Sequence, residues 1–299
     1  MTRTAPPRQL VFLGTPEMAV PPLRALVEAG FDVALVVTRI DKRRGRGSAL
    51  MPSPVKAAAL DLGLPVSHSV DDVIGTGADL GVVVAFGQLI KPHVLDVVPM
   101  VNLHFSLLPK WRGAAPVERA LLSGDRQTGV CLMQLEAGLD TGPVHACATV
   151  PIGPTTTAAV LRRELVRVGT ELLIGELTAG LDVPAPQVGE PSYAAKIDAA
   201  ELRIDWAKSP VEIDRLVRLG GAWTTLHGRR LRILDAALID AGAEPTHDLR
   251  GDRVGGLRLL VVQPEGRAPM PFDAFARGAR LADVEHLGDV VPATAAKGE

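Results

Sequence analysis

Apolar and polar positions follow one pattern up to about residue 177 and another beyond residue 205. Apolar runs at 10–13 and 31–38 predict strands, and the nearly continuous run at 79–86 is typical of a strand buried on both faces of a parallel sheet. Residues 18–29 are predicted to form a helix, because Gly14-Thr15-Pro16 ends the first run. This order predicts a parallel βαβ unit. The first strand is not followed by GxGxxG, so we do not expect a nicotinamide cofactor.

The pattern changes after a segment rich in proline and glycine. Before it, helices are predicted at 54–62, 116–122 and 156–177 and strands at 128–135 and 145–150. Residues 180–191, GLDVPAPQVGEP, have the composition of a linker. Short alternating strands at 223–227, 229–238 and 257–263 then predict a small β-barrel or OB-like module. We therefore predict an α/β domain over 1–186, a linker over 187–204 and an OB-like domain over 205–299.

The stretch 102–116, NLHFSLLPKWRGAAP, is the first candidate functional site. Asn102 and His104 alternate with apolar neighbours, so both side chains lie on one face of a strand. Pro109 then ends the strand, because it cannot continue a ladder. Open α/β sheets place their ligand sites at the ends of strands. A single histidine is more often structural, and here Asn102 and the constrained loop favour a functional role.

Two loops contribute further candidates, each with an ordinary alternative. Asp140 lies in EAGLDTG, where an Asp normally caps the backbone of a turn. It could instead orient a catalytic histidine, as in a triad. Residues Phe86, Gly87, Gln88 and Leu89 follow a buried strand and form either a wall of a ligand pocket or an ordinary loop.

Charge limits where a nucleic acid could bind. Hydrophobic residues make up 47% and charged residues 22% of the chain, and the net charge of −2 gives no global attraction for a polyanion. One segment, 39–56, is locally basic. Five positive residues are clustered at its start, Arg39, Lys42, Arg43, Arg44 and Arg46, against one negative charge at Asp41. The segment is either a solvated loop or an arm that contacts phosphates.

The remaining composition favours a cytoplasmic protein. Cys131 and Cys147 show neither CxxC nor metal-ligand spacing, so we expect small buried hydrophobic residues in a reducing compartment. No apolar run approaches the roughly 20 residues of a membrane span, and the apolar part of the first residues is too short for a signal peptide.

Several motifs together resemble the folate-dependent formyltransferases. They are NLHFSLLPKWRGAAPVERALLSGD, LEAGLDTG, VFLGTPEMAV, GRGSALMPSPVK, VVVAFGQLIKP and QPEGRAPMPFDAF. The resemblance covers nearly the whole chain, and WRGAAP with the arginine-rich loop is most similar to the branch that acts on a tRNA. It implies a Rossmann-like domain with a parallel-rich sheet followed by an OB-like barrel.

The resemblance also implies a reaction. Its formyl donor is 10-formyltetrahydrofolate, its acceptor is the α-amine of initiator methionyl-tRNA, and no metal takes part. Asn102, His104 and Asp140 match the catalytic set, and Ser106, Leu107, Leu108 and Pro109 match the folate-binding loop. Arg46 matches an arginine that approaches the acceptor end of the tRNA, and a two-domain clamp on one tRNA suits a monomer. Helper contacts to the tRNA are expected from three arginines of the barrel, Arg229, Arg230 and Arg232.

The chemistry assigns a role to each member of the set. Asn102 would donate a hydrogen bond to the developing oxyanion. His104 would either donate to the same oxygen or move the amine's proton, and both roles remain open. Asp140 would orient the imidazole and raise its protonated fraction. A sugar-nucleotide formyltransferase, a formyl-folate hydrolase and a tRNA-binding module without catalysis are the alternatives. WRGAAP and the basic loop disfavour the first, and the complete catalytic set disfavours the last.

Overall fold

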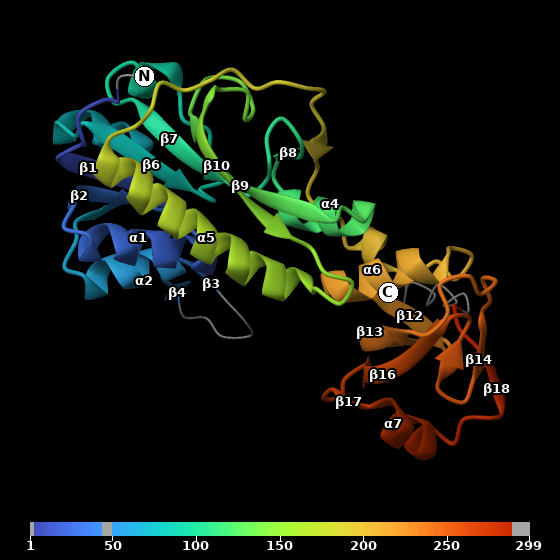
Figure 1. The fold of residues 1–299 in the computed structure, drawn as a ribbon. Helices are drawn as coiled ribbons and strands as arrows, with labels where there is room; N and C mark the ends of the chain where they lie inside the picture. The colour runs from blue at the N-terminus through green and yellow to red at the C-terminus, as the bar shows by residue number, and fades with distance from the viewer. Residues whose placement is uncertain (1–2, 44–49, 289–299) are drawn as a thin grey trace, which may run out of the picture. The chain divides into compact units, whose positions relative to one another are not determined.

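The computed structural model describes residues 3–43 and 50–288, and these form two compact units (Figure 1). The first unit comprises residues 1–120, 126–152 and 160–196. The second comprises residues 121–125, 153–159 and 197–299. None of the helices in the described ranges is both long enough and apolar enough to cross a membrane.

The first unit is built on a seven-stranded sheet with the strand order β10-β9-β7-β6-β1-β2-β5. The strands are β1 Gln9–Gly14, β2 Asp32–Val37, β5 Val66–Ser67, β6 Leu80–Val84, β7 Met100–His104, β9 Gln127–Gln134 and β10 Val144–Pro151. The pairs from β7 through β6, β1 and β2 to β5 are parallel, whereas β9 pairs antiparallel with β7 and with β10. The predicted α/β class with a parallel-rich sheet is confirmed.

Helices cover both faces of this sheet. They are α1 Val20–Glu28, α2 Pro54–Asp61, α3 Pro92–Leu95, α4 Pro116–Ser123 and α5 Ala158–Ala179, with the 3₁₀ turns η1 Glu17–Ala19 and η2 Val70–Thr76. Helix α2 begins where predicted, because the Ser53 hydroxyl accepts a hydrogen bond from the backbone N–H of Lys56 at 3.0 Å. A short hairpin joins β3 Lys42–Arg43 to β4 Leu50–Met51.

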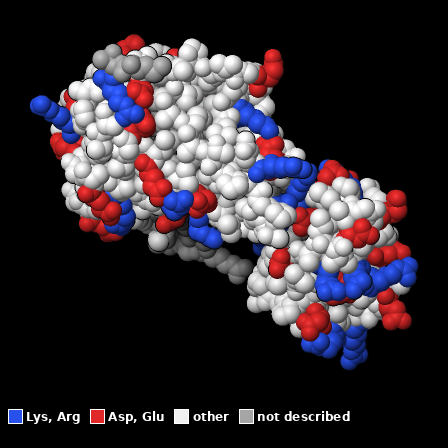
Figure 2. All heavy atoms as spheres, in the orientation of Figure 1, with Lys and Arg blue, Asp and Glu red and all other residues white. Residues whose placement is uncertain are grey.

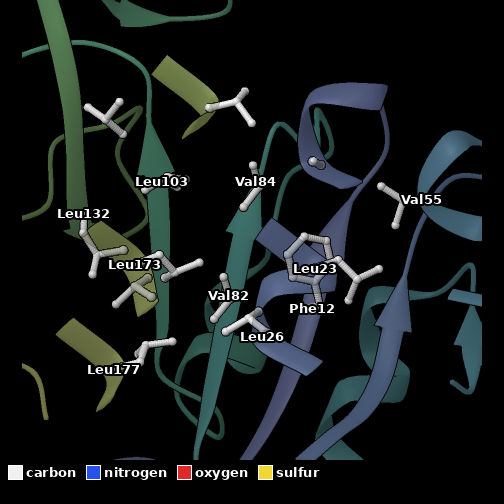
Figure 3. Packing of buried hydrophobic residues seen from close by; sticks show 14 of the residues in the cluster. Phe12, Leu23, Leu26, Val55, Val82, Val84, Leu103, Leu132, Leu173 and Leu177 are labelled. Atoms are coloured by element: carbon white, nitrogen blue, oxygen red, sulfur yellow. The ribbon is translucent and has the colours of Figure 1, made fainter. Parts of the chain in front are cut away.

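Strand periodicity determines which side chains enter each core. Phe12, Val82 and Leu103 pack with α1, α2 and α5 in one apolar cluster (Figure 3). Val11 and Met100, which alternate with them, belong to a second cluster on the opposite face. Because Leu103 lies in the first cluster, Asn102 and His104 point toward the opposite face, as the sequence predicted.

The second unit is an antiparallel sheet with two helices. Its strands are β12 Trp223–Leu226, β13 Arg229–Leu238, β14 Asp248–Arg250, β15 Arg253–Val254, β16 Leu257–Pro264, β17 Met270–Pro271 and β18 Val284–His286. The order is β12-β13-β16-β15-β14-β18, with β17 beside β16. The Gly288 N–H, just after β18, donates to the Thr225 carbonyl of β12 at 2.9 Å, so the two ends of the sheet meet.

Helix α6 Pro210–Leu219 was not predicted, although its start carries a recognisable signal. Ser209 and Glu212 form a capping box, and Pro210 lies in the first turn. The other helical elements described here are η3 Ala200–Leu202 and α7 Phe272–Ala279.

The prediction for the two cysteines was wrong. Cys131 on β9 and Cys147 on β10 are cross-strand partners joined by a disulfide, with their Cα atoms 4.2 Å apart. Cys131 is buried, but Cys147 is exposed. Spacing along the chain gives no sign of this pairing, because the antiparallel register of β9 and β10 brings the two residues together.

Candidate active site

The loop after β7 folds back on itself and brings a backbone carbonyl to His104. The Ser106 hydroxyl donates to the Lys110 carbonyl at 2.5 Å, the Leu108–Pro109 peptide is cis, and Trp111 has a positive φ of 62°. This path places the Trp111 carbonyl oxygen 3.0 Å from Nε2 of His104. Sequence reasoning missed this contact, because a main-chain acceptor has no signature in residue type.

The surroundings of His104 fix its tautomer. A carbonyl oxygen only accepts hydrogen bonds, so Nε2 carries the hydrogen and, in the neutral ring, Nδ1 has the free lone pair. Nδ1 lies 3.7 Å from Oδ2 of Asp140. That separation is too long for a hydrogen bond but short enough for a strong electrostatic interaction.

Burial decides the charge of this histidine. Loss of solvent lowers the pKa of His104 below its ordinary value of about 6.5, and the negative Asp140 and the Trp111 carbonyl oppose this only in part. The ring is therefore mainly neutral at neutral pH. Asp140 was expected to orient the imidazole and to increase its protonation. Its charge does raise the pKa of His104, although burial outweighs it, whereas the hydrogen-bond partner of the ring is the Trp111 carbonyl.

Asp140 caps a backbone group, which is one of the two roles that the sequence left open, and it also lies near His104. It lies between β9 and β10 with a positive φ of 49°, and its Oδ2 accepts a hydrogen bond from the Gly113 N–H at 2.8 Å. The carboxylate thus caps the backbone of one loop while facing Nδ1 of His104. A third side chain, Gln187, holds the backbone of the Asp140 loop through its amide.

Asn102 lies two residues before His104 on the same face of β7. Its side chain is half-buried and forms no hydrogen bond with any residue in the described part of the chain. The carboxamide N–H groups therefore remain available to an incoming oxygen atom. The structure thus places Asn102 and His104 on one strand and brings Asp140 to them from another loop.

The residues predicted to bind folate lie on the loops after β6 and β7, which are neighbouring parallel strands. Phe86 is buried in the second apolar cluster rather than on the surface. Gly87, Gln88 and Leu89 are exposed, whereas Leu107, Leu108 and Pro109 are half-buried. A Cβ atom built on Gly87 meets no heavy atom within 4 Å, so the backbone there faces open space.

The residues predicted to bind tRNA fall into two groups, one in each unit. In the first, Lys42 and Arg43 are exposed on β3 and Arg39 is half-buried, while Arg44 and Arg46 lie outside the described residues. In the second, Arg229, Arg230 and Arg232 are exposed on β13. The Arg230 Cζ atom lies 4.3 Å from the ring centre of Trp223. Within the described ranges, no group of three or more His, Cys, Asp or Glu residues could hold a metal ion.

Comparison with known proteins covers almost the whole chain. Residues 8–177 match the family described as "Formyl transferase", and residues 196–280 match "Formyl transferase, C-terminal domain". A methionyl-tRNA formyltransferase of Roseobacter denitrificans is 43% identical over 298 residues, which is 92% of this chain and 97% of that protein. One from Symbiobacterium thermophilum is 42% identical over 302 residues, which is 90% of this chain and 92% of that protein.

Solved structures of lower identity share the fold. WlaRD, a sugar 3N-formyl transferase, is 19% identical with a TM-score of 0.67, over 87% of this chain and 98% of its own. HypX from Aquifex aeolicus, solved with tetrahydrofolic acid, is 17% identical with a TM-score of 0.61. That match covers 91% of this chain and 47% of the HypX chain. The two domain matches and the near full-length relatives establish that this chain belongs to the formyl transferase family.

Proposed function

We propose that this protein transfers a formyl group from 10-formyltetrahydrofolate to the α-amino group of initiator methionyl-tRNA. The observation that supports this best is that Asn102 and His104 share one face at the end of β7, with the Asp140 carboxylate 3.7 Å from His104. Relatives more than 40% identical over nearly their whole length carry the name of this activity. We place the reaction in the cytoplasm, where translation occurs, and in a monomer, because one chain supplies all three side chains.

In the proposed mechanism, Asn102 and His104 assist the same bond-forming step. Asn102 acts at the formyl oxygen, and His104 acts at the attacking amine. The amine nitrogen bonds to the formyl carbon, and the carbonyl electron pair moves to the formyl oxygen. Asn102 donates a hydrogen bond to that oxyanion, and loss of one such donor typically costs about 10²–10³ in rate. Nδ1 of His104 accepts the amine's proton, a contribution of roughly 10²–10⁴.

Asp140 supports the proton transfer through its charge. Its carboxylate lies 3.7 Å from Nδ1 and would stabilise the imidazolium that forms when Nδ1 takes the proton. The oxyanion then re-forms its carbonyl, the bond to N10 of the folate breaks, and Nδ1 returns the proton to that leaving nitrogen. The proton that His104 takes from the amine is passed to the leaving folate nitrogen, so His104 ends the cycle neutral.

Substrate binding is assigned to the loops that surround this set. The folate ring system would lie against the apolar carbons of Leu107, Leu108 and Pro109, with Gly87 allowing its backbone to approach a ligand. The tRNA phosphates would contact the basic arm over 39–46 and the arginines of β13.

A single labelling experiment tests the function. Donor labelled in its formyl group is incubated with the protein and with methionyl-tRNA, an amino-sugar nucleotide or neither. We expect the label on methionyl-tRNA, and we expect Asn102→Ala and His104→Ala to fold yet transfer little of it. Label on the sugar nucleotide, or release as formate in the presence of the tRNA, would contradict the proposal.

A further inference from the structure

We propose that Gln187 is a positioning residue for Asp140 and His104, because its amide joins the loop that carries Asp140 to the loop that follows β7. The segment after α5 would then support the active site as well as connect the two units. Gln187 contacts no catalytic side-chain atom and would act through the backbone of Asp140. The inference uses the proposed function only for its kinetic readout.

The Gln187 carboxamide uses its full hydrogen-bonding capacity. Nε2 donates to the backbone carbonyls of Asp140 and Gly142, both at 2.8 Å. Oε1 accepts from Nε and Nη2 of Arg112 at 3.1 and 2.6 Å. Two donors and one oxygen with two lone pairs are all that an amide offers. The group is half-buried, so leaving any of these partners unpaired is costly.

The neighbours of Gln187 along the chain are themselves fixed. Before it, Ala185 exchanges two backbone hydrogen bonds with Val144 of β10, both at 2.8 Å. After it, strand β11 Tyr193–Ala194 pairs in parallel with β8 Arg112–Gly113. Between these two anchored segments, the Gln187 amide forms hydrogen bonds both with the loop that carries Asp140 and with Arg112 of the loop after β7.

The same two loops hold the catalytic contacts. The Asp140 carboxylate accepts from the Gly113 N–H at 2.8 Å, next to Arg112. The Trp111 N–H donates to Oγ of Ser192 at 2.9 Å, and its carbonyl contacts His104. Gln187 therefore fixes the backbone of Asp140 relative to the strand that continues from Trp111. The 3.7 Å separation between Asp140 and Nδ1 of His104 depends on both positions.

Two substitutions separate the donor contacts from the acceptor contacts. Gln187→Met keeps the length of the side chain and removes all four hydrogen bonds. Gln187→Glu keeps the acceptor for Arg112, as an ion pair, but replaces the donor with an oxygen that faces two carbonyl oxygens. A positioning role through Asp140 requires the Nε2 donor of Gln187, so both variants should lose activity. A role limited to tethering Arg112 would leave Gln187→Glu active.

The matched control is Val188→Ala, because Val188 is the next residue and is 88% exposed. In the kinetic assay we expect Gln187→Met and Gln187→Glu to lower kcat about 10- to 100-fold with little change in KM. A misplacement of about 1 Å can cost about 10²-fold. In the free protein, NMR titration should give a lower pKa for His104 in Gln187→Met than in the wild type or Val188→Ala, because the Asp140 carboxylate that raises this pKa is displaced.

Each outcome decides the inference. If Gln187→Met does not fold, Gln187→Glu carries the test, because it retains the contact with Arg112. Wild-type kcat in Gln187→Glu would overturn the proposal, as would an unchanged His104 titration in a folded Gln187→Met or an effect confined to KM. Failure of the wild type to formylate methionyl-tRNA would instead reject the proposed function, and the NMR titration would still test Gln187.

Discussion

The two ring nitrogens of His104 have different surroundings, and this difference gives each a separate part in the proposed reaction. Nε2 is committed to the Trp111 carbonyl, so it fixes the tautomer and the orientation of the ring. Nδ1 faces Asp140 and has the free lone pair. Because burial lowers the pKa of His104, the neutral base is the abundant form at neutral pH. Of the two roles left open by the sequence, this geometry favours proton transfer.

We predict that Asp140→Asn lowers kcat by about 10²–10⁴ and moves the acid limb of the kcat profile to lower pH. The carboxylate raises the pKa of His104, in opposition to burial. Removing its charge lets that pKa fall further below about 6.5, so inactivating protonation begins at a lower pH.

The measurement is kcat against pH at saturating concentrations of both substrates. The substrate amine is the same for both enzymes, so the difference between the profiles reports His104. Asp61→Asn, at a side chain that is 70% exposed, serves as the control and should match the wild type. A limb that stays in place or moves to higher pH would show that Asp140 does not act through the histidine.

For single residues, the sequence identified the candidate side chains of the site but not the main-chain groups that contact them. Asn102 and His104 were visible as a polar pair in an apolar strand, and Asp140 as an acidic residue in a glycine-rich turn. Trp111 acts through its carbonyl, and Gln187 acts from a segment whose composition indicated only a linker. Neither contact leaves a pattern in the sequence, because each depends on how the loop after β7 folds back.

Individual elements show which patterns are sufficient and which are not. The βαβ start, helices α2 and α5 and strand β13 follow from period, caps and turn residues. Helix α6 was not predicted, although Ser209 and Glu212 are the residue types of a capping box, because short strands were expected after residue 205. The antiparallel addition of β9 and β10 cannot be read from apolar runs, since buried strands look alike in either direction. The register that pairs Cys131 with Cys147 was therefore hidden as well.

We predict that reducing this disulfide lowers the free energy of unfolding by about 3 kcal/mol at most. The bond closes a loop whose ends are 16 residues apart, and cross-linking a loop of roughly 15 residues removes about 3 kcal/mol of chain entropy from the unfolded state. Urea denaturation with and without a reductant measures the difference. Cys147→Ala should have the stability of the reduced protein and should not respond to reductant. Equal stability of both forms of the wild type would contradict the prediction.

On the scale of the whole molecule, charge has to be used locally. The chain carries a net charge of −2, and on the face in Figure 2 Lys and Arg are interspersed with Asp and Glu over both units. Such a surface does not attract a polyanion as a whole. The proposed binding of tRNA must then depend on particular arginines with no acidic partner. Within the described residues, Arg230 and Arg232 form no ion pair, whereas Arg277 is paired with Asp273 at 3.0 Å.

We predict that Arg230→Ala weakens tRNA binding and reduces the slope of log K against log salt by a little under one unit. On B-DNA each phosphate contact contributes about 0.9 to that slope, because neutralising a phosphate releases its counterion, and we apply the same value to the tRNA by analogy. Arg277→Ala, which removes a charge already neutralised by Asp273, should leave the slope unchanged. Arg230→Lys keeps the charge but loses the guanidinium that lies over the Trp223 ring, and should retain most of the slope. Filter binding of methionyl-tRNA from about 50 to 200 mM salt measures all three variants, and KM for the folate donor should stay constant in each. If Arg230→Ala and Arg277→Ala have equal effects, the unit carrying β13 contributes no localised phosphate contact.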